Sequence, residues 1–497
     1  MFANPLLITA LTITGAVALW GVYDTAGLAG FAAYLVGVQF TSRAWFIMLA
    51  VSFMLITSIC LALSPYGRIK LGKDDEEPEF STISWLSMLF AAGMGVGLLY
   101  WGTAEPLTHY MLISAYQDPR ASASMALFVT NFHWGLHAWA IYALTGLVIA
   151  YFGFRKGCPS LVSAPILYVF GANRLTRGVG WICDLLAIVA IAIGLGGSVA
   201  MGVFQVKEGV DALFGLVDTG MGLTITIFAV LCASYILPLT VDLGRGMALL
   251  SNTAMAVAGG LMVYVLLFGP TNFLMGGIVQ AFGEYLGGVI THGFRTFTFM
   301  DNQINDWFQS WTLTYMVWWL AWAPFVGVFI ARISKGRTIR EFVSGVILIP
   351  TGFSILWFGV FGGVGFYGLL ERDSPILDVV RDNVSGVSFY VLNHFPLSSL
   401  TIAAVVVAAF LFIITSVVSA AFVLGMFSTG GDINPSTRVK LSWGAVLGAL
   451  GLVMILSGSI DAVKSIIALG ALPFVFIILL LVVCLLKTLK QEKDGSP

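Results

Sequence analysis

The chain has 497 residues, of which 59% are hydrophobic and 10% charged, with a formal net charge of −1 and a mean hydropathy of +0.95. A soluble globular chain carries about 25% charged residues, so this one lacks the charge to cover a water-facing surface of ordinary size. Soluble enzymes, disordered chains and, since the five cysteines lie far apart, disulfide scaffolds are excluded, and no basic surface is offered to nucleic acid. The composition predicts an all-α polytopic membrane protein.

Twelve apolar segments are long enough to cross a bilayer, which takes about 20 residues of helix. Lys and Arg residues are commoner in cytoplasmic connections than in outer ones. Of the 24 Lys and Arg residues, 17 lie in the even-numbered connections and the C-terminal tail, which share one side of the membrane. This distribution predicts cytoplasmic termini. The outer connection 269–307 contains an amphipathic piece, Phe282–Ile290, that we expect to lie along the outer surface. The predicted spans are 5–24, 45–64, 84–112, 123–154, 179–205, 222–240, 246–268, 308–333, 340–366, 398–427, 438–458 and 462–487.

The third predicted span contains glycines at alternate positions, Gly93, Gly95 and Gly97. Each glycine weakens a helix by about 1 kcal/mol relative to alanine. In lipid, a broken helix is tolerated only where its backbone lines a cavity or is buried in protein, and transporters use such breaks to bind ions and anionic groups. Close helix packing through small residues is the alternative. Later in the same span, Glu105-Pro106 is expected to stop or kink the helix.

Two stripes of aromatic residues lie in the middle of predicted spans. Tryptophans of an interfacial belt lie at the ends of membrane helices, so these stripes need another explanation. Facing tryptophans form a box suited to a quaternary ammonium group, which has no hydrogen-bond donor and is held by cation–π attraction. Ordinary aromatic packing between helices is the alternative. The stripes are Trp134, Trp139 and Tyr142, and then Tyr315, Trp318, Trp319 and Trp322.

Polar residues within spans offer two further candidate sites. Thr415 and Ser416, which follow Phe412, could bind sodium, because a hard cation prefers oxygen ligands. Hydrogen bonds from these hydroxyls to their own helix are the alternative. His133 and His137 have a spacing that can hold zinc, but no third ligand is near them in sequence, so we expect them to satisfy local polar groups on the helix that carries Trp134 and Trp139.

Three motifs together resemble the betaine/carnitine/choline transporter family. They are the glycine segment Gly93–Pro106, the segment Phe132–Tyr142 and the tryptophan-rich run Trp318–Phe342, which begins Trp-Trp-Leu-Ala-Trp-Ala-Pro. The resemblance covers nearly the whole chain. It implies a homotrimer of twelve-helix chains with a core of two inverted five-helix repeats. The corresponding units are 1–82 (two non-core helices), 83–268 (first repeat), 269–307 (outer connection), 308–487 (second repeat) and 488–497 (short cytoplasmic tail).

The resemblance also implies a substrate box and an ion site. The box would consist of Trp134, Trp139, Tyr142 and Trp319, with Trp322 a step closer to the cytoplasm and backbone N–H groups near Gly95 and Gly97 meeting a carboxylate. Sodium would be the coupling ion, and no other cofactor is expected. Its site would be formed by Ala91, Met94, Phe412, Thr415 and Ser416, the residue types found in sodium-coupled members.

Departures from the family pattern refine the expected function. Only one hydroxyl occurs in Gly194–Ser198, which disfavours a second sodium site. Choline-preferring relatives tend to carry an aspartate where this chain has Gly97, so a zwitterion fits better than choline. The short tail, without a long basic extension, disfavours steep osmotic activation.

The sequence thus predicts sodium-coupled uptake of glycine betaine across the bacterial inner membrane. Dimethylsulfoniopropionate, carnitine, ectoine and choline remain alternative substrates, and proton coupling or exchange remain alternative modes. A membrane-embedded enzyme would need a nucleophile–base set or a metal site in a span, and neither is evident. A channel, which usually has parallel repeats around a pore, would not need such a box.

Overall fold

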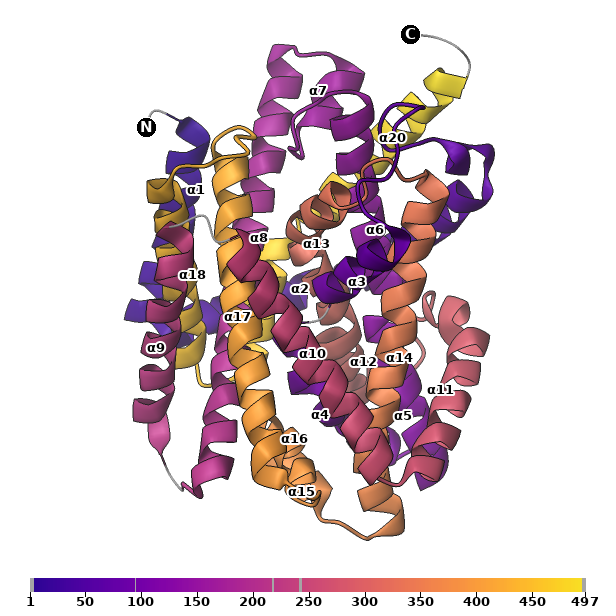
Figure 1. Ribbon diagram of the computed structural model, residues 1–497, viewed down its shortest axis with the longest axis vertical. Helices are drawn as coiled ribbons and strands as arrows, with labels where there is room; N and C mark the ends of the chain where they lie inside the picture. The colour runs from indigo at the N-terminus through magenta and orange to yellow at the C-terminus, as the bar shows by residue number, and fades with distance from the viewer. Residues whose placement is uncertain (1–3, 94, 217–218, 241–243, 494–497) are drawn as a thin grey trace.

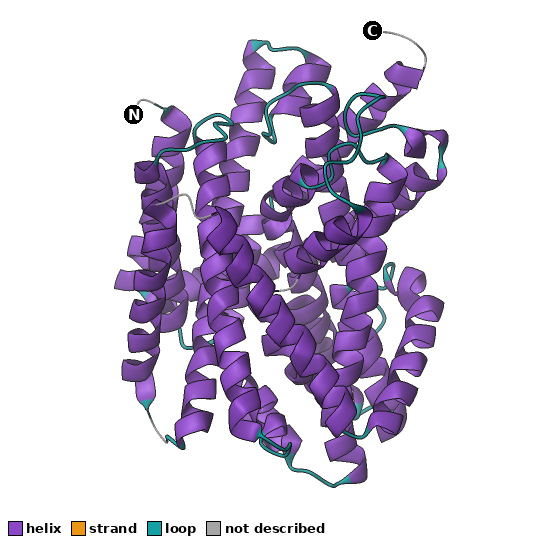
Figure 2. Cartoon of the chain, in the orientation of Figure 1, coloured by secondary structure: helices purple, strands orange, loops and turns teal. Residues whose placement is uncertain are grey.

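The computed structural model describes residues 4–93, 95–216, 219–240 and 244–493, and within them it is helical, with no strand (Figure 2). Most helices run along the long axis of the molecule, and both ends of the described chain lie at its upper end in Figure 1. The longer helices are α1 (Pro5–Tyr23), α2 (Thr25–Leu63), α3 (Thr82–Gly93), α4 (Val96–Ile113), α5 (Pro119–Trp134), α6 (Leu136–Ala150), α8 (Arg174–Phe214), α9 (Gly220–Thr240), α10 (Gly244–Phe268), α11 (Thr271–His292), α13 (Thr314–Arg332), α14 (Ile339–Glu371), α17 (Ser398–Ser428), α18 (Thr437–Leu456), α19 (Ile460–Ala471) and α20 (Phe474–Lys493).

Short helices fill the connections. They are α7 (Ala164–Phe170), α12 (Asn302–Phe308), α15 (Ile376–Asp382) and α16 (Val387–Leu392). A π-helical turn, Gln309–Leu313, joins α12 to α13, so that the chain enters α13 without a loop. Such π-helical turns are often found at functional sites.

Among the described residues, twelve helical segments are long and apolar enough to cross a membrane, the number that the sequence predicts. Eleven of them overlap predicted spans. The twelfth is α11, which falls in the connection that we expected to lie along the outer surface, while the predicted span 84–112 is divided into α3 and α4. One face of α11 packs on α5 and α14 (Figure 1). Its placement relative to the membrane stays a prediction.

Three predicted spans are interrupted. The break at Gly95 in span 84–112 was expected from its glycines, but the breaks at Gly135 and at Leu472–Pro473 were not. Proline has no backbone N–H, so Pro473 cannot continue the hydrogen-bonded ladder of α19. By contrast, Pro106 does not end its helix, since α4 continues to Ile113. The expected stop is wrong, and the alternative of a kink at Pro106 stays a prediction.

The most buried helices are α5, α6 and α8. In the apolar stretch of Pro119–Arg155, which contains α5 and α6, 94% of the residues are buried. The buried share is 89% for α8 and 22% for α9. Around this centre, α17 and α18 pack on α8, and α13 packs on α6 (Figure 1). Residues on α5 and α6 are therefore largely enclosed by other helices.

Small residues bring α6 and α13 into close contact. A Cβ atom added at Gly146 would lie 2.6 Å from a side-chain carbon of Ile330, and one at Gly327 would lie 3.2 Å from the backbone N of Gly146. Backbones approach this closely only where the residues are small. The crossing fixes the distance between the aromatic residues that each helix carries.

At the upper end of the molecule, the loop between α2 and α3 is joined to the loop between α13 and α14. The backbone N–H of Leu71 donates to the carbonyl of Arg337 at 2.8 Å, and that of Gly336 donates to the carbonyl of Leu71 at 2.9 Å. Arg332 pairs with Glu79, and these hydrogen bonds hold the pKa of the Glu79 carboxyl below its usual range. The two halves of the chain are thus fastened together at this end.

We predict that Gly327→Ala destabilises the protein by about 1–3 kcal/mol, because the added methyl group would lie 2.9 Å from Cγ2 of Thr145 and 3.2 Å from the backbone N of Gly146, which cannot rotate away. The matched control is Gly352→Ala on α14, where a Cβ atom meets nothing within 4 Å and alanine favours the helix. Thermal unfolding of the two purified variants in detergent makes the comparison. Equal melting temperatures would show that the α6–α13 crossing is not tight.

Candidate functional site: an aromatic box beside a buried carboxylate

The four predicted box residues lie together. Trp134 ends α5, Trp139 and Tyr142 are on α6, and Trp319 is on α13. Their rings meet nearly at right angles: the centroids are 5.4 Å apart for Trp139–Tyr142, 5.6 Å for Tyr142–Trp319 and 5.1 Å for Trp134–Trp319, with interplanar angles of 83°, 87° and 80°. Trp319 is half-buried and the others are buried. Neighbouring rings meet edge to face, so the four side chains form one continuous aromatic cluster.

Trp322 lies one turn further along α13 than Trp319, and its neighbours are not the rings of the box. Its ring packs against Phe325, with centroids 6.0 Å apart, and a Cβ atom added at Gly194 of α8 would lie 3.2 Å from it. Its indole N–H is buried and finds no acceptor among the described residues. The structure therefore places Trp322 beside the glycine segment of α8, next to the box rather than within it.

The predicted break in the third span lies directly against the box. Gly95 precedes α4 in an extended conformation (φ −134°, ψ −178°), and no side chain caps the helix. The first N–H groups of an α-helix have no partner within it, and the helix dipole makes this end attractive to anions. A Cβ atom added at Gly97 would lie 3.1 Å from Cη2 of Trp134, so glycine is what allows this close approach. Met94 and the side chain of Ala91 lie outside the described part.

One buried carboxylate, that of Glu105 on α4, orients the box. Its Oε2 accepts hydrogen bonds from the indole N–H of Trp134 at 2.9 Å and from the hydroxyl of Tyr315. Its Oε1 lies 2.9 Å from Nδ1 of His133 and 3.3 Å from Nε2 of His109. All five side chains are buried. A single group thus ties together α4, α5 and α13.

Sequence reasoning missed this role of Glu105. Buried charges in membrane spans are rare and usually functional, and His109 follows Glu105 at i+4 on the same helix face. Those two signals were available. The partners on α5 and α13 were not, because no periodicity within α4 reports which helices face it.

The same cluster contains a possible metal-ligand set. Ligand atoms of Glu105, His109 and His133 lie within 4.8 Å of one another. Trp307 donates its N–H to Nδ1 of His109 at 3.0 Å, and an indole N–H can only donate, so the His109 proton is on Nε2 and points to Glu105. Hydrogen bonds therefore already use the positions that a metal would need.

The predicted pair His133 and His137 does not converge on one site. Nε2 of His133 lies 2.9 Å from the hydroxyl of Thr312, whereas Nε2 of His137 lies 3.4 Å from the hydroxyl of Ser52 on α2. Each histidine contacts a polar group on another segment of the chain, so the expectation that both satisfy local groups on the helix of the box is wrong.

The break at Gly135 is closed by a side chain from another helix. The hydroxyl of Tyr285 on α11 accepts a hydrogen bond from the backbone N–H of Leu136 at 2.7 Å. A Cβ atom added at Gly135 would lie 2.1 Å from that hydroxyl oxygen, so only glycine leaves room for it. Because the break separates Trp134 from Trp139, α11 helps to set the angle between the two halves of the box.

The residues of the predicted sodium site on α17 are near the start of α4. A Cβ atom added at Gly202 of α8 would contact both Ile413 and Val96, so both segments lie against the same point of α8. Phe412 is buried and Ser416 half-buried. The hydroxyl of Thr415 donates to its own helix, with the carbonyl oxygens of Leu411 and Phe412 both at 3.0 Å. That hydrogen bond leaves an oxygen lone pair for a cation.

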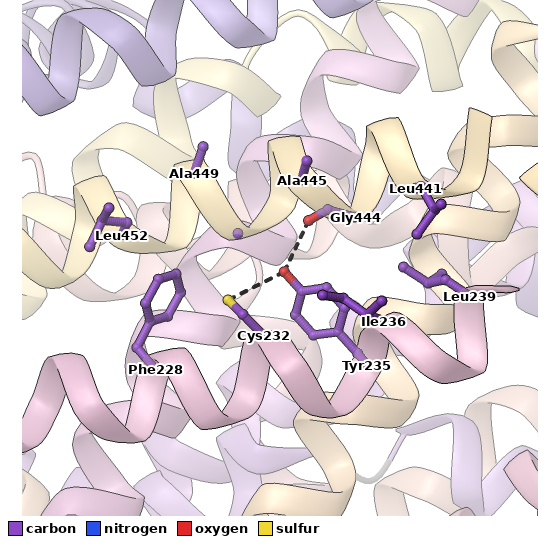
Figure 3. Close-up of a pocket in the computed structure, with 11 residues that line it drawn as sticks. Phe228, Cys232, Tyr235, Ile236, Leu239, Leu441, Gly444, Ala445, Ala449 and Leu452 are labelled. Atoms are coloured by element: carbon purple, nitrogen blue, oxygen red, sulfur yellow. Dashed lines mark hydrogen bonds between the residues drawn. The ribbon is translucent and has the colours of Figure 1, made fainter. Parts of the chain in front are cut away.

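A separate groove lies between α9 and α18 and does not resemble a site for a charged molecule (Figure 3). Phe228, Leu239 and Leu452 are typical of its apolar lining. The hydroxyl of Tyr235 donates to the carbonyl of Gly444 at 3.0 Å. None of the box residues lines this groove.

Comparison with known proteins gives one consistent result. The chain matches the model of the betaine/carnitine/choline family transporters over residues 5–494. It is 38% identical over 485 residues to the glycine betaine transporter OpuD of Bacillus subtilis, covering 97% of this chain and 94% of that one. It is 34% identical to a probable glycine betaine transporter of Desulfitobacterium hafniense (97% and 98% covered) and 33% identical to an ectoine/hydroxyectoine transporter of Virgibacillus pantothenticus (91% and 90% covered).

We predict that Glu105→Gln destabilises the protein by about 2–4 kcal/mol, because the amide leaves buried donors without an acceptor. Tyr315→Phe, which removes one donor and keeps the carboxylate, should cost about 1 kcal/mol. Thermal unfolding of both variants in detergent measures the difference. If Glu105→Gln were no less stable than Tyr315→Phe, the carboxylate would not be what holds the box.

Proposed function

The chain belongs to the betaine/carnitine/choline transporter family, and on that basis we propose that it takes up glycine betaine in symport with sodium. It is a multi-pass membrane transporter and not an enzyme. The proposal concerns the substrate, the coupling ion and the direction of transport. Its main support is the box of four aromatic rings beside the break in the third span.

The chemistry of the box fits a methylated cation. A quaternary ammonium cannot donate a hydrogen bond, so ring faces are its best partners, and a desolvated cation–π contact is worth about 2 kcal/mol. Two of the three indole N–H groups of the box are already occupied: that of Trp134 by Glu105, and that of Trp319 by the carbonyl of His133 at 2.8 Å. What these tryptophans offer to a substrate is therefore ring surface.

A zwitterion fits the site better than choline. The uncapped start of α4 at Gly95 can receive a carboxylate. A side chain at position 97 would meet Trp134, so an aspartate there would bring a negative charge to the box, whereas this chain has Gly97. Glycine betaine supplies both charges itself.

Other substrates of the same class remain candidates. Dimethylsulfoniopropionate and carnitine have methylated cationic heads, and ectoine has a delocalised cation and a carboxylate. One relative is named for ectoine and hydroxyectoine, and others for glycine betaine. The box would accept any soft cation of suitable size.

We propose that sodium binds at the site that the family resemblance implies, formed by Ala91, Met94, Phe412, Thr415 and Ser416. The start of α4 and the Phe412–Ser416 segment both lie against Gly202, which supports a shared site. A cation bridging the two segments would stabilise one arrangement of the two repeats and so couple ion binding to alternating access. We further propose a homotrimer in the bacterial inner membrane with cytoplasmic termini.

The proposal is tested by uptake of labelled glycine betaine into proteoliposomes with and without an inward sodium gradient. Accumulation that requires sodium is expected, and competition by unlabelled dimethylsulfoniopropionate, carnitine, ectoine and choline gives the order of preference. Exchange against preloaded substrate without a sodium requirement would contradict the symport proposal.

We predict that Trp319→Leu weakens glycine betaine binding at least tenfold, because about 2 kcal/mol of cation–π attraction is lost. Trp45→Leu, at a position 60% exposed on α2, is the matched control. Binding of the labelled compound to purified protein is the measurement. Unchanged affinity in the Trp319 variant would remove the box from the proposal.

We predict that Thr415→Ala raises the sodium concentration needed for half-maximal uptake several-fold, because one oxygen ligand is lost. Thr401→Ala on the same helix is the control, since its hydroxyl also donates to its own helix, to the carbonyl of Ser398 at 2.9 Å. If both variants keep the sodium dependence of the parent, Thr415 is not a ligand.

A further inference from the structure

The break between α5 and α6 lies within the aromatic box. Trp134 is the last residue of α5, Gly135 is not helical (φ −105°, ψ −140°), and Trp139 lies in the first turn of α6. In a continuous helix each backbone N–H donates to the carbonyl four residues earlier, so a break frees backbone groups on both of its sides. In a membrane protein the freed groups must find partners elsewhere in the protein.

Side chains from other helices bind these freed groups. The hydroxyl of Tyr285 on α11 accepts a hydrogen bond from the backbone N–H of Leu136 at 2.7 Å. The indole N–H of Trp319 on α13 donates to the carbonyl of His133 at 2.8 Å. In a continuous helix both backbone groups would bond across the position of the break. These side chains therefore replace bonds that would otherwise fix α5 and α6 in line.

Ser354 on α14 forms a third link to the break. Its hydroxyl lies 3.2 Å from the carbonyl oxygen of Trp134 and 3.0 Å from that of Pro350 on its own helix. A hydroxyl has one proton to donate, so the two carbonyls share it. One turn further along α14, Phe358 packs on the ring of Trp134, with centroids 5.6 Å apart. We call the break, with its links to α11, α13 and α14, the joint.

The joint separates one wall of the box from the others. Trp134 lies before it, and Trp139 and Tyr142 lie after it. The ring of Trp319 contacts both sides, with centroids 5.1 Å from Trp134 and 5.6 Å from Tyr142. A small rotation at Gly135 would therefore change the distance between the walls while every ring of the box stayed the same.

We propose that Tyr285 and Ser354 are positioning residues that hold the joint at the angle that suits a trimethylammonium group, and that they thereby set the size of the cationic head group that the box accepts. Neither residue contributes a ring to the box, and both are buried, at 1% and 3% exposed. The inference rests on the proposed function in taking the substrate to be a methylated cation bound in the box. It adds that hydrogen bonds from α11 and α14 decide which head groups fit.

The test compares the binding of glycine betaine and of its N,N,N-triethyl analogue to the purified full-length protein. The two compounds have the same charges and the same carboxylate, and they differ in the size of the head group. We expect the parent to prefer glycine betaine about tenfold or more, as pockets that discriminate by added methylenes do. Tyr285→Phe and Ser354→Ala each remove one link with little change in volume, and each should reduce this preference about threefold or more.

Matched controls remove a buried hydroxyl elsewhere in the protein. Tyr235→Phe on α9 deletes a hydrogen bond to the carbonyl of Gly444 at 3.0 Å, and Ser58→Ala on α2 deletes one to the carbonyl of Met54 at 2.8 Å. Both controls should keep the preference of the parent. Melting temperatures are measured on the same preparations, because a merely structural role of the joint would lower them without changing the preference.

An unchanged preference in Tyr285→Phe or in Ser354→Ala would overturn the proposal for that residue. A parent that binds both compounds equally, or controls that lose as much preference as the joint variants, would overturn it altogether. If Tyr285→Phe does not fold, Ser354→Ala still tests the joint. Failure of the proposed function would look different, since the parent would then bind neither compound.

Discussion

The inner arrangement of this transporter depends on one buried negative charge. The Glu105 carboxylate is held by donors from α4, α5 and α13, and two of them, Trp134 and Tyr315, carry rings of the aromatic cluster. A carboxylate in a membrane interior is stable only when its lone pairs are satisfied. The need to satisfy Glu105 therefore fixes the indole of Trp134, and the carbonyl of His133 then fixes that of Trp319. The indole N–H groups of Trp134 and Trp319 are therefore bonded within the protein, and what these two tryptophans offer to a ligand is ring surface.

Two of the helix breaks serve this arrangement. At Gly95 and Gly97 the start of α4 comes against Trp134, and at Gly135 the hydroxyl of Tyr285 enters between the two halves of the box. In lipid, backbone groups freed by a break must find partners in the protein. These two breaks lie beside the box. The one at Gly95 leaves N–H groups that no side chain caps, whereas the one at Gly135 is closed by the Tyr285 hydroxyl.

Much of the architecture follows from patterns within single segments. Apolar length predicts the number of spans. Two mid-span aromatic stripes suggest a box, and the family resemblance selects Trp134, Trp139, Tyr142 and Trp319, whose rings do meet. Alternate glycines predict the break at Gly95. Glu105 and Gly135 were missed for one reason: each is defined by a side chain on another helix, and a periodicity within one segment does not show which helices become neighbours. The apolar length of α11 likewise does not distinguish a crossing from an outer connection.

The central claim is that the box recognises positive charge and not merely a bulky methylated group. Competition between labelled glycine betaine and its carbon isostere 3,3-dimethylbutyrate tests this most directly. The two have nearly the same shape and the same carboxylate, but the isostere lacks the cation. The account predicts that the isostere competes at least tenfold more weakly, since about 2 kcal/mol of cation–π attraction is absent. Equal competition would mean that the rings act by apolar packing alone and would contradict the account.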